Sequence, residues 1–239
     1  RGHISLIKRA KRESSKVIVS IFVNPSQFNK SNDFKKYPRN ISKDLIILKK
    51  LKVDFVLIPS AKDIFKNQRS MKIKISKNDK VLCAKFRPGH FEGVLGVINQ
   101  FLKKIQSKRI YLGEKDFQQI YLIKKFIKNK FKIKVCTCKT VRGKGFLPLS
   151  SRNNLLKKNE IKKASLISQN IKKFYFSIKG NFNNKHKIFQ VRNNLNKMGV
   201  VIEYFELRNK NTLSKKFNKR NFKLFIAFYV NKVRLIDNI

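Results

Sequence analysis

Residues suited to anion binding stand where predicted strands and helices begin or end. His3 follows a glycine at the expected start of a helix, where free backbone N–H groups and the helix dipole attract phosphate. Arg87 and His90 flank a Pro-Gly turn in "FRPGHFEG" (86–93), and two cationic groups there also suit an anion. A surface histidine, or an arginine in a basic chain, would look the same. Taken alone, His3 is therefore better explained as a surface histidine, and Arg87 does not by itself indicate an anion site.

The segment "YLGEKDFQQI" (111–120) is the most informative. A predicted strand stops at Gly113, and a helix then begins among closely spaced polar side chains: Glu114, Lys115, Asp116, Gln118 and Gln119. A lysine can neutralise phosphate, a carboxylate can reach a ribose or magnesium, and glutamine amides can hold a small polar acid. Charges that cap a helix start explain the two acids but not the glutamine pair.

Two further segments carry polar groups at element ends. "SIFVNPSQF" (20–28) ends a predicted strand in Asn24 and Gln27, whose amides can hold a hydroxyl or a carboxylate, and an ordinary Asn-Pro turn explains them equally well. "LPLSSRNN" (147–154) offers two serine hydroxyls and Arg152 to a triphosphate. A simple helix N-cap would account for the serines alone.

Alternating strands and helices must position these groups in the first half of the chain. Predicted strands cover 16–23, 53–59, 109–112 and 132–141, and predicted helices cover 4–10, 44–51, 92–106 and 116–128. The first two strands are continuous apolar runs, typical of strands that are covered on both faces. This order predicts an α/β fold with a Rossmann-like doubly wound parallel sheet, whose ligands bind beyond the carboxyl ends of the strands.

The pattern changes near residue 150. Helices at 158–177 and 184–198 precede strands at 200–207 and 222–230, and the last strand turns at Asn231 into "VRLID" as a hairpin. We therefore expect a nucleotide-binding domain over residues 1–150 and a smaller α+β domain over residues 151–239.

The charge balance is extreme, because 58 Lys+Arg minus 13 Asp+Glu gives +45. Such a chain binds nucleic acid non-specifically by counterion release. The lysines are spread through every predicted element and accompany abundant Asn, Ile and Phe, which favours compositional drift over a selected nucleic-acid site. A basic nucleic-acid-binding protein is kept as the alternative function.

Cysteine usage and hydropathy exclude other classes. Cys83, Cys136 and Cys138 do not form a disulfide framework, and the pair in "KVCTC" is predicted to lie on one face of a strand. No apolar run reaches the ~18 residues of a membrane span, and the chain start lacks the apolar block of a signal peptide. The predicted location is cytoplasmic.

The motifs occur in the order and spacing of a known family. "VIVSIFVNPSQF", "NDFKKYPR", "RPGHFEGV", "GEKDFQQ", "LSSRN" and "RLIDN" resemble the pantoate–β-alanine ligases (pantothenate synthetases), which are nucleotidyltransferases with a HIGH motif. The resemblance implies a homodimeric ligase with a C-terminal lid that joins pantoate to β-alanine through a pantoyl-adenylate. It implies ATP as substrate, magnesium as cofactor, and AMP and pyrophosphate as products.

The resemblance also implies roles for individual residues. His3, Lys115 and Arg152 are the expected catalytic residues, with His3 contacting phosphate and donating a proton. The expected ATP-binding residues are His3, Gly113, Glu114, Lys115, Asp116, Val141, Leu149, Ser150, Ser151 and Arg152. Asn24, Gln27 and Gln119 are expected to hold pantoate, Gln27 also β-alanine, and Asp116 the magnesium ion. Arg87 and His90 match a loop that borders the substrate cavity.

The chain departs from the family pattern at three places. The family's first strand and first motif histidine have no counterpart, an acidic pair is reduced to Asn32-Asp33, and an Asp-Gly pair has become Gly145-Phe146. From the missing strand we expect either a longer protein or an inactive remnant of this ligase fold.

Overall fold

The chain forms two compact units in a computed structural model that describes residues 1–25, 40–65, 73–180 and 185–239. The units are Arg1–Lys139 and Thr140–Ile239, so the division falls before the boundary expected near residue 150. The segment after β4 (Lys134–Cys138) belongs to the second unit, because Arg142 forms an ion pair there with Asp237.

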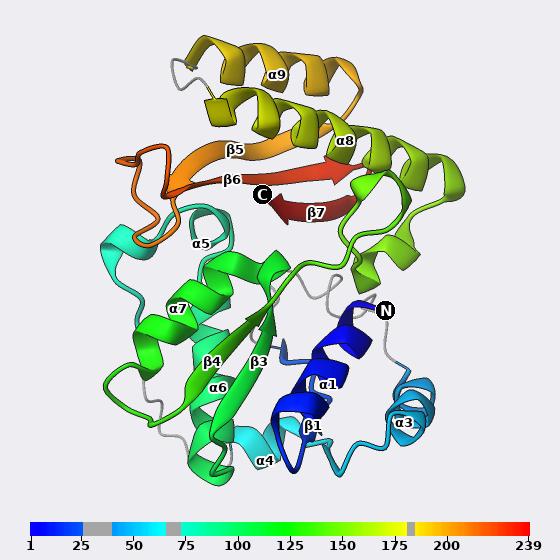
Figure 1. The fold of residues 1–239 in the computed structure, drawn as a ribbon, viewed down its shortest axis with the longest axis vertical. Coiled ribbons are helices and arrows are strands. Elements are labelled where there is room, and N and C mark those ends of the chain that lie inside the picture. Colours follow the sequence, from blue (N-terminus) through cyan, green and yellow to red (C-terminus); the bar gives the residue numbers. More distant parts are fainter. Residues whose placement is uncertain (26–39, 66–72, 181–184) are drawn as a thin grey trace. The chain divides into compact units, whose positions relative to one another are not determined.

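The first unit alternates helices with short parallel strands (Figure 1). In chain order its elements are α1 (Gly2–Glu13), β1 (Ile18–Ser20), α3 (Ile41–Lys50), β2 (Phe55–Leu57), α4 (Ala61–Phe65), η2 (Lys77–Asp79), α5 (Cys83–Phe86), α6 (His90–Lys104), β3 (Arg109–Gly113), η3 (Glu114–Asp116), α7 (Phe117–Ile127) and β4. The predicted order of the longer elements is confirmed, because apolar periodicity specifies it locally.

The strands of this unit confirm the α/β class. β1 pairs with β2 and β3 with β4, both in parallel, with Gly113 opposite Cys138 at the end of the second pair. No described strand bridges β1 and β3, so the two pairs stay separate among the described residues. The sequence pattern predicts one doubly wound sheet instead.

The prediction that the first two strands are covered on both faces is wrong for the described residues. Ile18 of β1 is 43% exposed and Phe55 of β2 is 56% exposed. Burying both faces of a strand requires a layer on each side, and the β1–β2 pair has no such second cover within the described part of the chain. In β4, by contrast, Cys136 and Cys138 are buried on one face, as predicted, and neither is in a disulfide.

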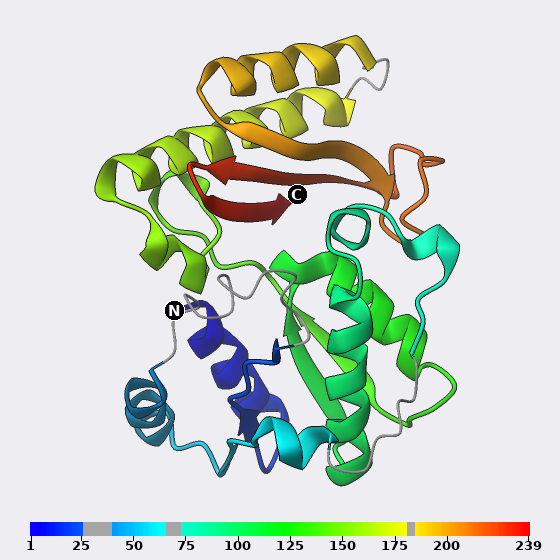
Figure 2. The same cartoon turned by 180° about the vertical axis from the view of Figure 1, so that it is seen from behind.

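The second unit has helices on one side of an antiparallel sheet (Figures 1 and 2). Its elements are η4 (Lys144–Phe146), η5 (Ser151–Leu155), α8 (Lys158–Gly180), α9 (Lys185–Lys197), β5 (Val201–Asn209), β6 (Phe222–Val230) and β7 (Val233–Asn238). The strand order is β5-β6-β7, and the predicted hairpin is confirmed, with Asn231 at a φ of 50° in its turn.

The core of the second unit follows from the pattern of α8. Ala164, Ile167 and Ile171 recur at three- and four-residue spacing and are fully buried. They join Phe205 of β5 and Ile226 of β6 in one apolar cluster. Across the described residues, no helix has the length and apolar character needed to span a membrane.

Candidate active site

His3 lies near the N-terminus of α1, which is anchored along the β3–β4 pair. Near the other end of the helix, the carboxylate of Glu13 accepts a hydrogen bond from the Tyr111 hydroxyl of β3 at 3.2 Å, and Arg9 donates to the carbonyl of Thr137 in β4 at 2.7 Å. Because a helix rises 1.5 Å per residue, His3 lies about 9 Å beyond Arg9 along the axis. The helix therefore carries the exposed His3 toward the carboxyl ends of the two strands.

The expected ATP-binding segment begins at that same end of the sheet. β3 ends at Gly113, and η3 carries Glu114, Lys115 and Asp116 into α7. Lys115 Nζ lies 3.0 Å from Asp116 Oδ1, and both side chains retain access to solvent, at 21% and 43% exposure. A lysine and a helix N-terminus at strand ends form an electropositive position suited to phosphate.

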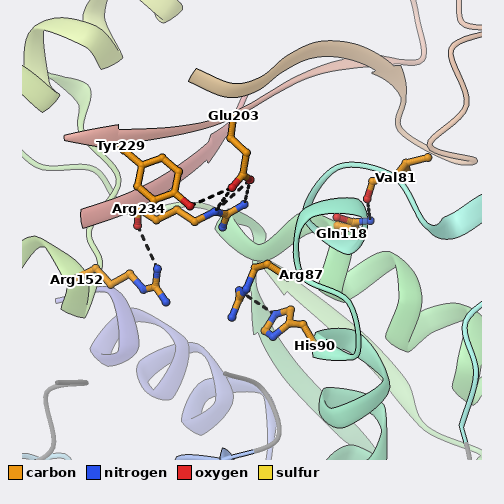
Figure 3. A network of polar contacts seen from close by, with 8 residues as sticks. All are labelled: Val81, Arg87, His90, Gln118, Arg152, Glu203, Tyr229 and Arg234. Carbon is orange, nitrogen blue, oxygen red and sulfur yellow. Dashed lines mark hydrogen bonds and ion pairs between the residues drawn. The ribbon is translucent and has the colours of Figure 1, made fainter. Parts of the chain in front are cut away.

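The two glutamines that follow have different surroundings. Gln118 is buried and its Nε2 donates to the carbonyl of Val81 at 2.7 Å (Figure 3), so this amide holds the preceding segment against α7. Gln119 is half-buried. The pair that helix capping could not explain thus contains one amide with a structural partner.

The turn before α6 brings Arg87 and His90 together. Arg87 Nη1 lies 3.2 Å from His90 Nε2 (Figure 3). Gly89 caps α6 at a φ of 79°, a left-handed conformation that glycine adopts without strain. Asn24 is buried and its Nδ2 donates to the carbonyl of Gly93 at 3.1 Å, which links the residues after β1 to α6.

The expected pantoate residue Gln27 lies outside the described residues, as do Asn32 and Asp33. Of the expected residues in the first unit, the structure links Asn24 and His90 through α6 and places Gly113, Glu114, Lys115 and Asp116 together at the end of β3.

The remaining expected residues belong to the second unit. The carbonyl of Val141 accepts a hydrogen bond from the backbone N–H of Leu149 at 3.0 Å. Ser150 caps η5 by accepting from the backbone N–H of Arg152 at 3.2 Å, so the N-cap explanation holds for this hydroxyl. Ser151 is the first residue of η5.

Arg152 is tied to a partly buried polar network in the β-sheet of its own unit. Its Nη1 donates to the carbonyl of Arg234 at 3.3 Å, and Arg234 Nε donates to Glu203 at 3.1 Å (Figure 3). The Tyr229 hydroxyl also donates to Glu203 at 3.1 Å. Burial and the nearby Glu203 carboxylate raise the pKa of Tyr229, so this hydroxyl stays protonated.

A hollow of about 720 Å³ in the second unit contains none of the expected site residues. Its lining comes from the η4 segment and one face of α8: Arg142, Gly143, Gly145, Phe146, Gln169, Lys172, Lys173 and Phe176. A Cβ added at Gly145 would lie 2.5 Å from the Ser165 Cβ, so glycine permits the close contact of η4 with α8.

Sequence reasoning missed one polar cluster in the first unit. The buried carboxylate of Asp79 accepts hydrogen bonds from Ser76, Tyr121 and Lys125. Two signals were available, namely the scarcity of acidic residues and the i, i+3, i+7 spacing of Gln118, Tyr121 and Lys125 on one helix face. Among the described residues, no group of three or more His, Cys, Asp or Glu could hold a metal ion.

Comparison with known proteins gives a consistent result over the whole chain. The sequence profile of the family described as pantoate-beta-alanine ligase matches residues 1–239. A pantothenate synthetase of Francisella tularensis subsp. novicida is 40% identical over 239 residues, which cover 99% of this chain and 84% of that protein.

Solved structures agree with the sequence comparison. The pantoate-beta-alanine ligase from Francisella tularensis, crystallised with beta-gamma ATP and beta-alanine, has a TM-score of 0.85 and 39% identity, covering 100% of this chain and 84% of that one. Pantothenate synthetase from Thermus thermophilus has a TM-score of 0.89 and 27% identity, covering 100% of this chain and 88% of that one.

A parallel strand pair in which β3 ends in a Gly-Glu-Lys-Asp segment, beside a helix with His3 in its first turn, is typical of an ATP-dependent ligase with a Rossmann-like unit, as in the solved relative. The full-length match then identifies the family. The chain belongs to the pantoate-beta-alanine ligases.

Proposed function

We propose that this chain catalyses the ATP-dependent condensation of (R)-pantoate with β-alanine to pantothenate, with release of AMP and pyrophosphate. The observation that carries the proposal is the family match over residues 1–239, with the Gly113–Asp116 segment in place at the end of β3.

The reaction proceeds in two steps that require no enzyme nucleophile. A carboxylate oxygen of pantoate attacks the α-phosphorus of ATP, the bond to the bridging oxygen breaks, and pyrophosphate leaves. The amine of β-alanine then attacks the carbonyl carbon of pantoyl-adenylate, AMP leaves, and the nitrogen loses a proton. Catalysis in such a site depends on positioning and on stabilisation of charge.

The first unit supplies cationic groups for the phosphates. We assign Lys115 to charge stabilisation on the triphosphate, and His3, at the N-terminus of α1, to phosphate contact and proton donation. Asn24, Gln27 and Gln119 hold pantoate, and Gln27 also serves β-alanine. Arg87 and His90 border the substrate.

The second unit supplies further contacts to ATP. Val141 lies against adenine, and Leu149, Ser150, Ser151 and Arg152 contact the triphosphate. The hydrogen bond from Arg152 to the Arg234 carbonyl supports this assignment, because it holds the guanidinium in one position beside β7.

Magnesium is the cofactor that this chemistry implies. Asp116 would hold it, because its carboxylate retains 43% exposure and follows the phosphate-binding lysine. Mg²⁺ is commonly held by one or two carboxylates together with substrate phosphates and water, which fits the single carboxylate offered here. When bound, the ion neutralises charge on the phosphates.

The homodimer and the cytoplasmic location stay proposals that rest on the family resemblance. Binding of nucleic acid is assigned to the general positive charge of +45 rather than to a dedicated site.

Substitution of Lys115 tests the proposed function. AMP and pyrophosphate release should require both pantoate and β-alanine, and Lys115→Ala should lower kcat about 100-fold or more through the loss of charge stabilisation. Lys124→Ala removes the same charge from an exposed position of α7 and should leave the rate unchanged.

Absence of pantoate-dependent AMP release by the unsubstituted chain would refute the proposal. Thermal melting with ATP and magnesium then separates the remaining possibilities, because an inactive remnant that has lost its ATP site shows no ligand-induced stabilisation.

A further inference from the structure

One face of α7 holds the segment that leads to the Arg87–His90 turn. The carboxylate of Asp79, which is 3% exposed, accepts from Ser76 Oγ and Lys125 Nζ at 2.7 Å each and from the Tyr121 hydroxyl at 3.1 Å. We call Ser76, Asp79, Tyr121 and Lys125 the Asp79 latch. Three donors satisfy a buried carboxylate that would otherwise carry a large desolvation cost.

Gln118 adds a second link next to the latch. Its Nε2 donates to the carbonyl of Val81 at 2.7 Å and reaches the Asp79 carbonyl at 3.4 Å. Gln118, Tyr121 and Lys125 thus bind the η2 segment from one face of α7, over about two helical turns.

The backbone beyond η2 is held in an uncommon conformation. Leu82 has a φ of 50° although it is not glycine, and its side chain is only 1% exposed. Such strain persists only where the surroundings determine the backbone strongly. The latch and the Gln118 link provide that constraint on the residues directly before Leu82.

The two elements that the latch joins, α7 and the segment after η2, both lead to proposed substrate-site residues. α7 follows Glu114–Asp116 and includes Gln119, whereas the segment beyond Leu82 passes through α5 to Arg87 and His90. In the described part of the chain, the latch and the Gln118 bond connect α7 to the segment that leads to Arg87 and His90.

We propose that Asp79 is a positioning residue that sets the spacing between the Arg87–His90 turn and the Gln119 side of the pantoate site. The proposal rests on the proposed function. A displacement of about 1 Å between groups that hold a substrate can reduce activity about 100-fold, so a latch outside direct substrate contact has kinetic consequences.

The latch predicts which kinetic constant changes. Gln119 of α7 holds pantoate and the Arg87–His90 turn borders it, so loss of the latch should weaken pantoate binding. The Gly113–Asp116 segment assigned to ATP lies before α7 and is not part of the latch. The KM for pantoate should therefore rise while the KM for ATP stays constant.

Asp79→Asn tests the latch, because asparagine keeps the shape but loses the charge that pairs with Lys125. The KM for pantoate should rise about tenfold, with less than about twofold change in kcat and in the KM for ATP. Tyr121→Phe removes one donor with little change in packing and should raise the same KM by a smaller factor.

Lys124→Met is the control variant. It removes the charge of a neighbouring, exposed lysine of α7 that lies outside the latch. The proposal is overturned if Asp79→Asn leaves the pantoate KM unchanged, or if the KM for ATP rises equally. A purely structural role would lower stability without this separation of constants.

Hydrogen exchange and calorimetry separate failure of the latch from failure of the proposed function. Backbone amides of residues 80–90 should exchange faster in Asp79→Asn than in Lys124→Met, and equal exchange refutes the latch. If the unsubstituted chain binds neither pantoate nor ATP in calorimetry, the proposed function fails and the positioning role fails with it. If it binds both and Asp79→Asn binds pantoate equally well, only the positioning role fails.

Discussion

Gln118 and Gln119 are chemically identical neighbours with different surroundings. Successive residues of a helix point about 100° apart, so Gln118 reaches the Val81 carbonyl while Gln119 stays half-buried and free of that contact. Local sequence offers both amides equally to a substrate. The segment packed against the helix determines that Gln118 is the amide that forms this structural hydrogen bond.

Asp79 should link stability to pH. Burial raises the pKa of this carboxyl, but hydrogen bonds from Lys125, Ser76 and Tyr121 outweigh burial, so the pKa lies below its ordinary value of 3.8. A lowered pKa in the folded state gives stability that is present above the unfolded pKa and is lost as pH falls through the folded pKa.

Asp79→Asn should therefore lower the free energy of unfolding by about 1–3 kcal/mol near neutral pH, with a smaller difference below about pH 4. Urea unfolding at both pH values measures this. Asp44→Asn, at an exposed position of α3, is the control. A difference that stays constant from neutral to acid pH would contradict the assignment.

Contacts between distant elements hold the η4 segment to the last strand of the second unit. Arg142 forms a bidentate pair with Asp237 of β7, at 2.7 and 2.9 Å, and its Nη1 also donates to the Phe146 carbonyl. The Asp237 side chain is only 1% exposed. The same guanidinium lies 3.9 Å from the centroid of the Phe146 ring, so one side chain organises the whole η4 turn.

Breaking this pair should destabilise the second unit strongly. Asp237→Asn leaves the Arg142 charge without its carboxylate, and such changes cost about 3–5 kcal/mol. Denaturant unfolding followed by circular dichroism measures the loss. Glu13→Gln, which breaks the exposed pair with Arg9, should leave the midpoint nearly unchanged. Similar midpoints for the two variants would show that the buried pair does not stabilise η4.

At the scale of the whole molecule, the charge of +45 is the dominant property. Lysines and arginines occupy the last turns of α1, α3, α6 and α7 in the first unit, where they also complement the helix dipoles. A charge distributed over many elements attracts polyanions without reading a sequence.

Binding to single-stranded RNA should therefore depend on salt and not on sequence. Fluorescence anisotropy with two labelled oligonucleotides of equal length and different sequence should give affinities that agree within about threefold and fall steeply as salt rises. A preference of about 1,000-fold for one sequence would instead support the nucleic-acid-binding alternative.

The amino-acid sequence by itself determined the α/β class, the order of the long elements, the β6–β7 hairpin and the family. These features depend on local periodicity and on motifs such as "GEKDFQQ", which neighbouring residues specify. Apolar patterning could not show that β1 and β2 leave Ile18 and Phe55 exposed, because burial depends on which layers cover a strand.

Only the tertiary structure decided which polar side chains stabilise the fold. Lys125 lies 46 positions from Asp79 and Arg142 lies 95 from Asp237, so local sequence does not identify which acid each cation pairs with. The structure also assigned Gln118 to Val81 and Asn24 to Gly93. Folding sets these partnerships because a buried charge or amide requires a partner, and the chain brings that partner from a distant element.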